Sequence, residues 1–135
     1  MKGLFLDDFR NPHKVNWVDY PEHVAWTVVK SGPDFMRFYD KEDWGIVSLD
    51  HDLIPEHYEK LMDNPMEHLL CLEENWPEVK EWTGFQCFRF FLKYLETNGK
   101  TLPEIKIHTR NPVGALMMSD LLKNYQIFKS REIIV

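Results

Sequence analysis

This chain alternates short apolar runs with longer segments in which apolar residues recur at helical spacing. An apolar run of about four to eight residues is typical of a strand buried in a parallel sheet. The clearest runs cover residues 3–6, 45–49 and 104–108. Residues 15–20 predict a second, shorter strand, and the tail, with apolar residues at 127–128 and 133–135, predicts a last one.

The segments between these strands predict helices. Pro21 suits the first turn of a helix, and an apolar stripe interrupted near residues 31–33 predicts two helical pieces after it. The stripe consists of Val24, Val28, Phe35, Phe38 and Tyr39. Residues 84–95 predict an amphipathic helix that ends at Asn98-Gly99, and Pro112 opens another helix. The apolar residues of that helix are Val113, Leu116, Met117, Leu121 and Leu122.

The order of these elements, β-β-α-β-α-β-α-β, predicts a three-layer α/β fold built on a mostly parallel sheet. Residues 55–82, after the central strand, are acidic and aromatic and are cut by Pro65 and Pro77. We interpret this segment as a helical insertion within a single domain that covers residues 1–135. A lid, a dimer contact and a surface for a partner protein are all open as its role.

Composition and charge narrow the class of protein. A chain of 135 residues that is 44% apolar and 28% charged is typical of one globular domain. The formal charge of -6 argues against generic binding to nucleic-acid backbones, which calls for a basic surface. No apolar run approaches the roughly 20 residues that cross a bilayer, and no signal-peptide pattern precedes the first strand. Because Cys71 and Cys87 also lack metal-binding spacing, we expect a cytoplasmic protein with reduced thiols.

Three of the predicted strands run directly into polar residues that can carry chemistry. These are Asp7-Asp8-Phe9-Arg10, Asp50-His51-Asp52 and His108-Thr109-Arg110-Asn111. Because parallel strands deliver their carboxyl ends to one edge of the sheet, where such folds bind ligands, we expect these side chains to meet. Four carboxylates and two imidazoles gathered there repel one another unless a cation or a phosphate chemistry requires them. Hard oxygen ligands of this kind favour Mg²⁺ or Mn²⁺.

Each motif also has a purely structural interpretation. Asp7-Asp8 fits a surface turn, and a buried histidine such as His108 is often a packing residue with satisfied hydrogen bonds. Thr83-Gly84, ahead of the predicted helix, fits either an anion contact or a helix N-cap. The histidines without ligand-like spacing are His13, His23, His57 and His68. The shared position of the three strand-end motifs is what favours function over structure for them.

Taken together and in order, four motifs resemble the signature of the cyclic-phosphate-processing receiver-like domain, a bacterial and phage family related to response-regulator receivers. The motifs cover residues 4–12, 48–53, 83–84 and 108–114. The resemblance implies a flavodoxin-like fold and an acidic pocket for Mg²⁺. It also implies the hydrolysis of a small cyclic phosphate, such as ADP-ribose cyclic phosphate or a 2′,3′-cyclic nucleotide.

The favoured hypothesis, a metal-dependent hydrolase, gives each residue a role. The predicted metal ligands are Asp7, Asp8 and Asp50, and by the resemblance Asp50 also matches the phosphate-accepting residue of a receiver. The predicted catalytic residues are Asp50, His51, Asp52 and His108. Asp52 or His51 is the expected base, and His108 is the expected acid. The predicted substrate-binding residues are Arg10, Thr83, Gly84, Thr109 and Asn111.

A non-catalytic module that binds or sequesters a phosphorylated ligand, or a partner protein, is the alternative. In that reading the segment at 55–82 serves a protein partner or a homodimer. The lysine of signalling receivers has no secure counterpart, with Lys129 and Arg10 as candidates for its charge, which disfavours phosphorelay signalling. Two histidines beside a metal favour the enzyme, because the binding of a phosphate alone does not require paired acid and base groups.

Overall fold

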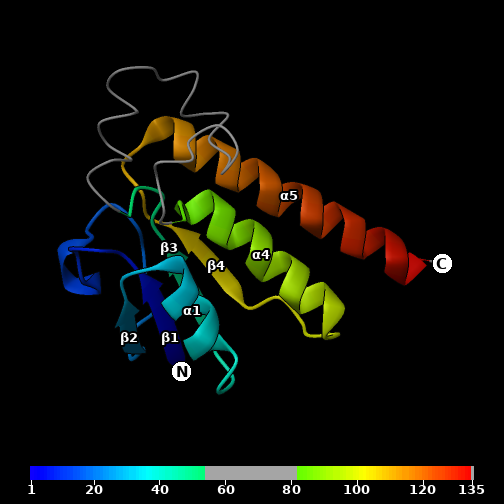
Figure 1. Cartoon of the computed structure of the whole chain (residues 1–135), viewed down its shortest axis with the longest axis horizontal. Coiled ribbons are helices and arrows are strands. Elements are labelled where there is room, and N and C mark those ends of the chain that lie inside the picture. The colour runs from blue at the N-terminus through cyan, green and yellow to red at the C-terminus, as the bar shows by residue number, and fades with distance from the viewer. Residues whose placement is uncertain (54–81, 135) are drawn as a thin grey trace.

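The computed structural model describes residues 1–53 and 82–134 and contains a sheet of four parallel strands (Figure 1). The strands are β1 (Lys2–Leu6), β2 (Ala25–Val29), β3 (Ile46–Leu49) and β4 (Glu104–Ile107), arranged in the order β2-β1-β3-β4. The helices described are the 3₁₀ turn η1 (Pro12–Lys14), α1 (Gly32–Tyr39), α4 (Gly84–Thr97) and α5 (Pro112–Ile134). The predicted α/β fold with a parallel sheet is confirmed. The predicted insertion lies outside the described residues, apart from residue 82.

The second strand is not where the sequence pattern placed it. Residues 15–20 form no strand, and β2 instead pairs with β1 in parallel from Lys2↔Ala25 to Leu6↔Val29. The helical piece predicted directly after Pro21 is therefore wrong, and only the second piece exists, as α1. The segment Ala-Trp-Thr-Val-Val is rich in β-branched and aromatic residues, which favour a strand, and two apolar residues four apart do not outweigh that preference.

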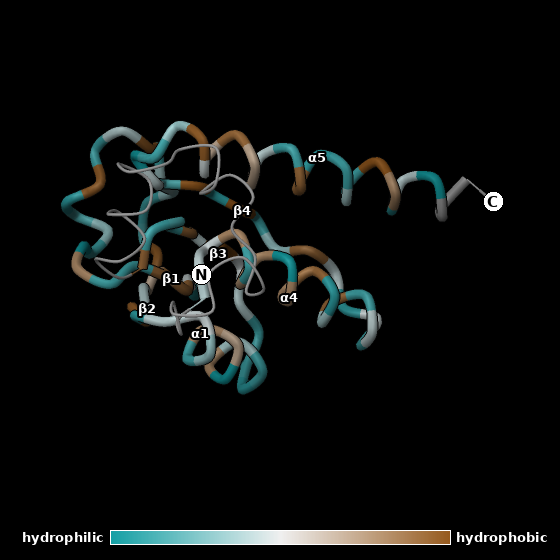
Figure 2. The backbone as a smooth tube through the Cα atoms, turned by 45° about the horizontal axis from the view of Figure 1, so that its top comes forward, coloured by the Kyte–Doolittle hydropathy of each residue, from teal (hydrophilic) through white to brown (hydrophobic). Residues whose placement is uncertain are grey.

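The predicted last strand is also wrong, because α5 continues to Ile134. No Gly or Pro occurs between residues 115 and 134, so the sequence contains no signal that would end the helix earlier. Figure 2 shows α5 extending past the rest of the described chain. Within the described part of the chain, no helix is both long enough and apolar enough to cross a membrane.

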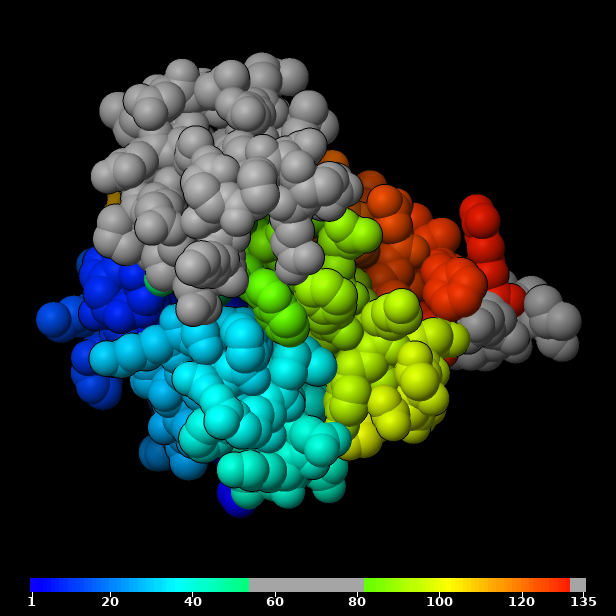
Figure 3. Space-filling view, in the orientation of Figure 1, coloured from blue at the N-terminus to red at the C-terminus, as the bar shows by residue number. Residues whose placement is uncertain are grey.

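One face of the sheet packs on helices. Alternate residues of β1 and β3 point into a core that α1 and α4 cover, and Figure 3 shows these two helices side by side. The strand residues of this core are Leu4, Leu6, Val47 and Leu49. On the helix side, the Phe91 ring meets the Phe35 ring at 5.3 Å and the Tyr39 ring at 4.5 Å, both nearly edge-on. This apolar layer fixes the strands whose ends carry the candidate motifs.

The opposite face is aromatic and polar. The Phe5 ring lies 6.4 Å from Tyr20 and 5.8 Å from Trp26, and it stacks on His108 at 4.3 Å. Ser48, fully buried on β3, points to the same side and contacts both Tyr20 and His108. The segment between β1 and β2 supplies Tyr20, so a loop packs here against the sheet. His108 is therefore held between β1 and this loop.

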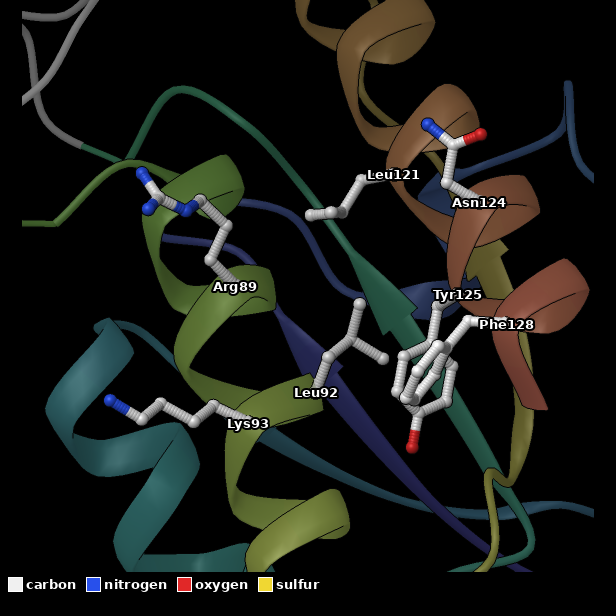
Figure 4. A pocket seen from close by; sticks show the side chains of 7 residues that line it. All are labelled: Arg89, Leu92, Lys93, Leu121, Asn124, Tyr125 and Phe128. Carbon is white, nitrogen blue, oxygen red and sulfur yellow. The ribbon is translucent and has the colours of Figure 1, made fainter. Parts of the chain in front are cut away.

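A hollow of about 460 Å³ separates α4 from α5 (Figure 4). It is lined by Arg89, Leu92, Lys93, Leu121, Asn124, Tyr125 and Phe128. Near it, Lys129 of α5 pairs with Glu96 at 2.9 Å. Because Glu96 lies about 18 Å along α4 from Gly84, Lys129 does not bring a charge to the strand ends, and the sequence-based suggestion that it replaces the receiver lysine is wrong.

The start of α4 lies directly on the end of β3. The Gly84 N–H donates to the His51 carbonyl oxygen at 2.7 Å, and a Cβ atom at Gly84 would lie 1.7 Å from the backbone oxygen of Asp50. Thr83 and Gln86 form a capping box there, in which each side chain accepts a hydrogen bond from the other residue's backbone N–H. Only glycine permits this close approach of two backbones.

Replacing Gly84 by Ala is expected to destabilise the fold by about 2 kcal/mol or more, because backbone atoms at the end of β3 must move to admit the methyl group. Chemical denaturation measures the effect. Gly45→Ala is the matched control, since its Cβ meets the flexible side chain of Met1 and a smaller loss is expected. Equal losses in the two variants would contradict the tight fit assigned to Gly84.

Candidate active site

The ends of β1, β3 and β4 hold the candidate side chains through the sheet's own hydrogen bonds. The ladder continues one residue past each strand: Asp7 N–H donates to Val29, Asp50 N–H to Leu6 and His108 N–H to Leu49, each at 3.0 Å. All three of these strand-end side chains are buried. The edge predicted from the sequence therefore exists, and rigid backbone positions its residues.

A chain of hydrogen bonds runs through His108. Its Nε2 lies 2.9 Å from Asp7 Oδ2, its Nδ1 lies 2.8 Å from Ser48 Oγ, and Ser48 Oγ lies 2.7 Å from the Tyr20 hydroxyl. Because an ionised carboxylate only accepts, Nε2 carries the proton and donates to Asp7. Nδ1 then accepts from Ser48, and Ser48 accepts from Tyr20. The chain thus fixes one tautomer of the imidazole.

Asp7 and His108, which form one hydrogen bond of this chain, differ in their charge. Burial alone would raise the pKa of Asp7, but hydrogen bonds from His108 and from the backbone N–H groups of Phe9 and Arg10 outweigh it and lower the pKa. Burial lowers the pKa of His108 more than the Asp7 carboxylate raises it. Burial also raises the pKa of Tyr20 to about 12, which keeps its hydroxyl protonated as a donor. Asp7 is therefore charged while His108 is neutral at neutral pH.

Arg10 supplies the positive charge of the centre. Its Nη1 lies 3.4 Å from Asp7 Oδ2 and 3.7 Å from Asp50 Oδ2, and its side chain is mostly buried. The sequence-based suggestion that Arg10 replaces the charge of the receiver lysine stays a prediction. One guanidinium opposite Asp7, Asp8 and Asp50 leaves negative charge uncompensated.

Asp8 and Asp50 each hold a buried oxygen that lacks a hydrogen-bond partner among the described residues: Oδ1 of Asp8 and Oδ2 of Asp50. Burial, followed by the charge of Asp7, raises the pKa of Asp8 to about 6 and that of Asp50 to about 7. Unpartnered buried oxygens and raised pKa values are typical of carboxylates at a metal-binding site from which the cation is absent. In the described part of the chain, ligand atoms of Asp7, Asp50 and His108 lie within 4.8 Å of one another and could hold a metal ion. The carboxylate oxygens fit a divalent cation, and His108, whose Nε2–H donates to Asp7, lies directly behind them.

A second cluster joins the β3 motif to the start of α5. His51 Nδ1 lies 3.1 Å from Asp52 Oδ1, and Asn111 Nδ2 donates to Asp52 Oδ2 at 3.1 Å. Asn111 Oδ1 accepts from the N–H groups of Val113 and Gly114, so it caps the first turn of α5. A Cβ atom at Gly114 would lie 2.5 Å from the His51 ring. The helix start therefore holds this acid–base pair in place.

The remaining predicted substrate contacts differ in how close they come to the centre. A side-chain hydrogen bond from Thr109 lowers the pKa of Asp50 against the larger effect of burial, which places the Thr109 hydroxyl at the centre. Thr83 and Gly84, in contrast, use their polar atoms in the capping box and in the bond to His51. Their geometry is that of the helix N-cap, the structural interpretation that the sequence also allowed.

Sequence reasoning missed Tyr20 and Ser48. Ser48 carried a usable signal, because it is the polar residue within the otherwise apolar strand Ile46–Leu49. Tyr20 carried none, since it approaches His108 only through the fold of the loop between β1 and β2. Trp17 was also missed, although its indole N–H donates to the His108 carbonyl oxygen at 2.8 Å.

The fold and the site together define a receiver-like α/β domain with an acidic centre at the carboxyl edge of its parallel sheet. The family model of the cyclic-phosphate processing Receiver domain matches residues 2–124, and the chain belongs to this family. Neither a curated protein nor a solved structure matches the chain. The resemblance inferred from the four motifs is confirmed, and with it the association with cyclic-phosphate processing.

Without a divalent cation, the centre is expected to make the protein less stable as pH rises from about 4 to about 7. The folded state retains protons on Asp8 and Asp50 in this window, while the unfolded chain releases them near 3.8. Asp50→Asn removes most of this slope and is expected to raise the free energy of unfolding at neutral pH by roughly 1–3 kcal/mol in EDTA. Asp7, whose pKa is lowered, contributes its stability at higher pH and loses it only in acid.

Chemical denaturation over a pH series measures this effect. Asp43→Asn, at an exposed position ahead of β3, is the matched control and is expected to leave the slope unchanged. A loss of stability in Asp50→Asn at neutral pH would contradict the charge balance described for the centre.

Proposed function

We propose that this chain is a hydrolase that opens a small cyclic phosphate with a divalent cation, Mg²⁺ or Mn²⁺, at the carboxyl edge of its sheet. The observation that carries the proposal is the pair of buried oxygens on Asp8 and Asp50 that lack hydrogen-bond partners among the described residues, next to the His51–Asp52 pair. Hard carboxylate oxygens are the ligands that these cations prefer. Membership of a family associated with cyclic-phosphate processing supports the substrate class.

The carboxylates of Asp7, Asp8 and Asp50 would hold the cation. When bound, such an ion polarises a phosphoryl group and lowers the pKa of a water molecule. Arg10, which already lies at these carboxylates, binds a phosphate oxygen. The Thr109 hydroxyl, which donates its one proton to Asp50 in this structure, would turn to bind another when the cation takes up that carboxylate. The chain thereby places a phosphate between its guanidinium and its acidic centre.

His51 acts as the base, and Asp52 orients it. Asp52 accepts the Nδ1–H of His51, so the lone pair lies on Nε2, and Asn111 holds Asp52 in turn. The oxygen of water attacks phosphorus, one ring P–O bond breaks, and His51 takes a proton from the water. The departing ring oxygen takes up a proton from solvent. The product is a phosphate monoester with a free hydroxyl group.

For His108 we infer a positioning role in place of the general acid expected from the sequence. Both ring nitrogens are engaged in hydrogen bonds and the side chain is fully buried, so it has no proton to offer a substrate in this arrangement. Its Nε2–H instead holds Asp7 charged and fixed in orientation. Ser48 and Tyr20 act through His108, in the manner of groups behind a metal ligand.

Release of the ring-opened product from a panel of cyclic phosphates tests the proposal. The panel contains ADP-ribose cyclic phosphate and 2′,3′-cyclic nucleotides, each with Mg²⁺ or Mn²⁺ and with EDTA. We expect turnover of at least one compound, its loss in EDTA, and a loss of about a thousandfold in Asp50→Asn. Asp43→Asn is the matched control and retains turnover. Tight binding of one compound, with no turnover of any compound in the panel, would contradict the hydrolase and favour the non-catalytic binding module.

Ser48→Ala is expected to lower turnover about tenfold, because His108 loses the donor that fixes its tautomer. Tyr20→Phe is expected to have a smaller effect in the same direction. Nitrogen NMR of the imidazole provides the separate readout: protonated Nε2 in the wild type and a mixture of tautomers in Ser48→Ala. Ser119→Ala, exposed on α5, is the control. An unchanged imidazole spectrum in Ser48→Ala would remove the positioning role.

A further inference from the structure

A group of aromatic and arginine side chains, all but Arg10 exposed, lies beside the acidic centre. The guanidinium of Arg110 stacks 4.6 Å from the Trp17 ring, and that of Arg10 lies 5.5 Å from the same ring and 4.3 Å from the Phe9 ring. We call these four residues, Phe9, Arg10, Trp17 and Arg110, the Trp17 platform. Its members come from the loop after β1 and from the turn between β4 and α5.

The platform is attached to the candidate active site at two points. The Trp17 indole N–H donates to the backbone oxygen of His108 at 2.8 Å, which fixes the ring to the end of β4. Arg10 contacts the platform rings with the same guanidinium that pairs with Asp7 and Asp50. The platform and the acidic centre therefore share the Arg10 guanidinium.

The platform's exposure and charge are more than packing requires. Phe9 is 61% exposed and Trp17 is 37% exposed, and Arg110 is exposed and makes no ion pair within the described residues. An isolated cation–π contact on a surface contributes little to stability. Two guanidinium groups beside an acidic centre, in a chain of formal charge -6, favour the approach of an anion.

We propose that the Trp17 platform is the subsite that binds the nucleobase of a nucleotide cyclic phosphate. This inference rests on the proposed function for the position of the phosphate. Planar bases stack on aromatic rings and on arginine guanidinium planes alike, so a base extends the existing stack of Trp17 and Arg110. The phosphate then lies toward Arg10, at the acidic centre. A cyclic phosphate of a sugar or polyol lacks the planar group and leaves the platform unused.

Binding of adenosine monophosphate and of ribose 5-phosphate, measured by calorimetry in the presence of Mg²⁺, tests the inference without any turnover. The two probes share the ribose and the phosphate and differ by the base. The wild type is expected to bind adenosine monophosphate at least about tenfold more tightly. Arg110→Gln and Trp17→Leu are each expected to bring the ratio of the two affinities close to one, while the affinity for ribose 5-phosphate changes less than the affinity for adenosine monophosphate.

Arg89→Gln is the matched control, because Arg89 also stacks on an aromatic ring, that of Phe85, but on α4. It is expected to leave the ratio unchanged. If Trp17→Leu does not fold, Arg110→Gln decides, since Arg110 is exposed. A ratio of one in the wild type, or a ratio that neither variant changes, overturns the inference. If a base-free cyclic phosphate is turned over and the ratio of the two affinities is one, only the inference about the platform is overturned. If the affinity ratio depends on the base but no cyclic phosphate is turned over, only the proposed hydrolase is overturned.

Discussion

The burial of several carboxylates side by side is the constraint on which the rest of this structure depends. Asp7 and Asp50 are almost completely removed from water. Asp8, which follows Asp7 in the sequence, has a pKa between those of Asp7 and Asp50. A buried charge without compensation is strongly unfavourable, and like charges add to that penalty. The chain compensates Asp7 with His108, two backbone N–H groups and Arg10. It leaves Asp8 and Asp50 with raised pKa values, which is the arrangement that a divalent cation completes.

The two faces of the sheet position the residues of this centre in different ways. The helical face is apolar and rigid, and it holds β1 and β3 in register so that their last residues emerge together. The loop-covered face carries Ser48 and Tyr20, which act on His108 from behind. The glycine at position 84 lets α4 begin against Asp50, and Gly114 lets α5 begin against His51. Two helix starts thus pack against the β3 motif.

Much of this arrangement could be predicted from the sequence, because it follows from local patterns. Apolar runs located β1, β3 and β4, and the rule for parallel sheets brought their polar ends together. The family resemblance followed from the same motifs. What could not be predicted depends on tertiary contacts: a strand at Ala25–Val29 in place of a helix, Tyr20 reaching Ser48, and Trp17 reaching the end of β4. The tail was predicted wrongly because apolar residues near a chain end fit a strand and a continuing helix equally well.

The most direct test of the central claim is a titration with Mn²⁺ followed by electron paramagnetic resonance, which counts free and bound ions without any substrate. The account predicts one bound ion per chain at neutral pH, competition by Mg²⁺, and loss of that ion in Asp50→Asn but not in Asp43→Asn. Equal Mn²⁺ binding by the wild type and Asp50→Asn, or no binding by the wild type at millimolar Mn²⁺, would contradict it.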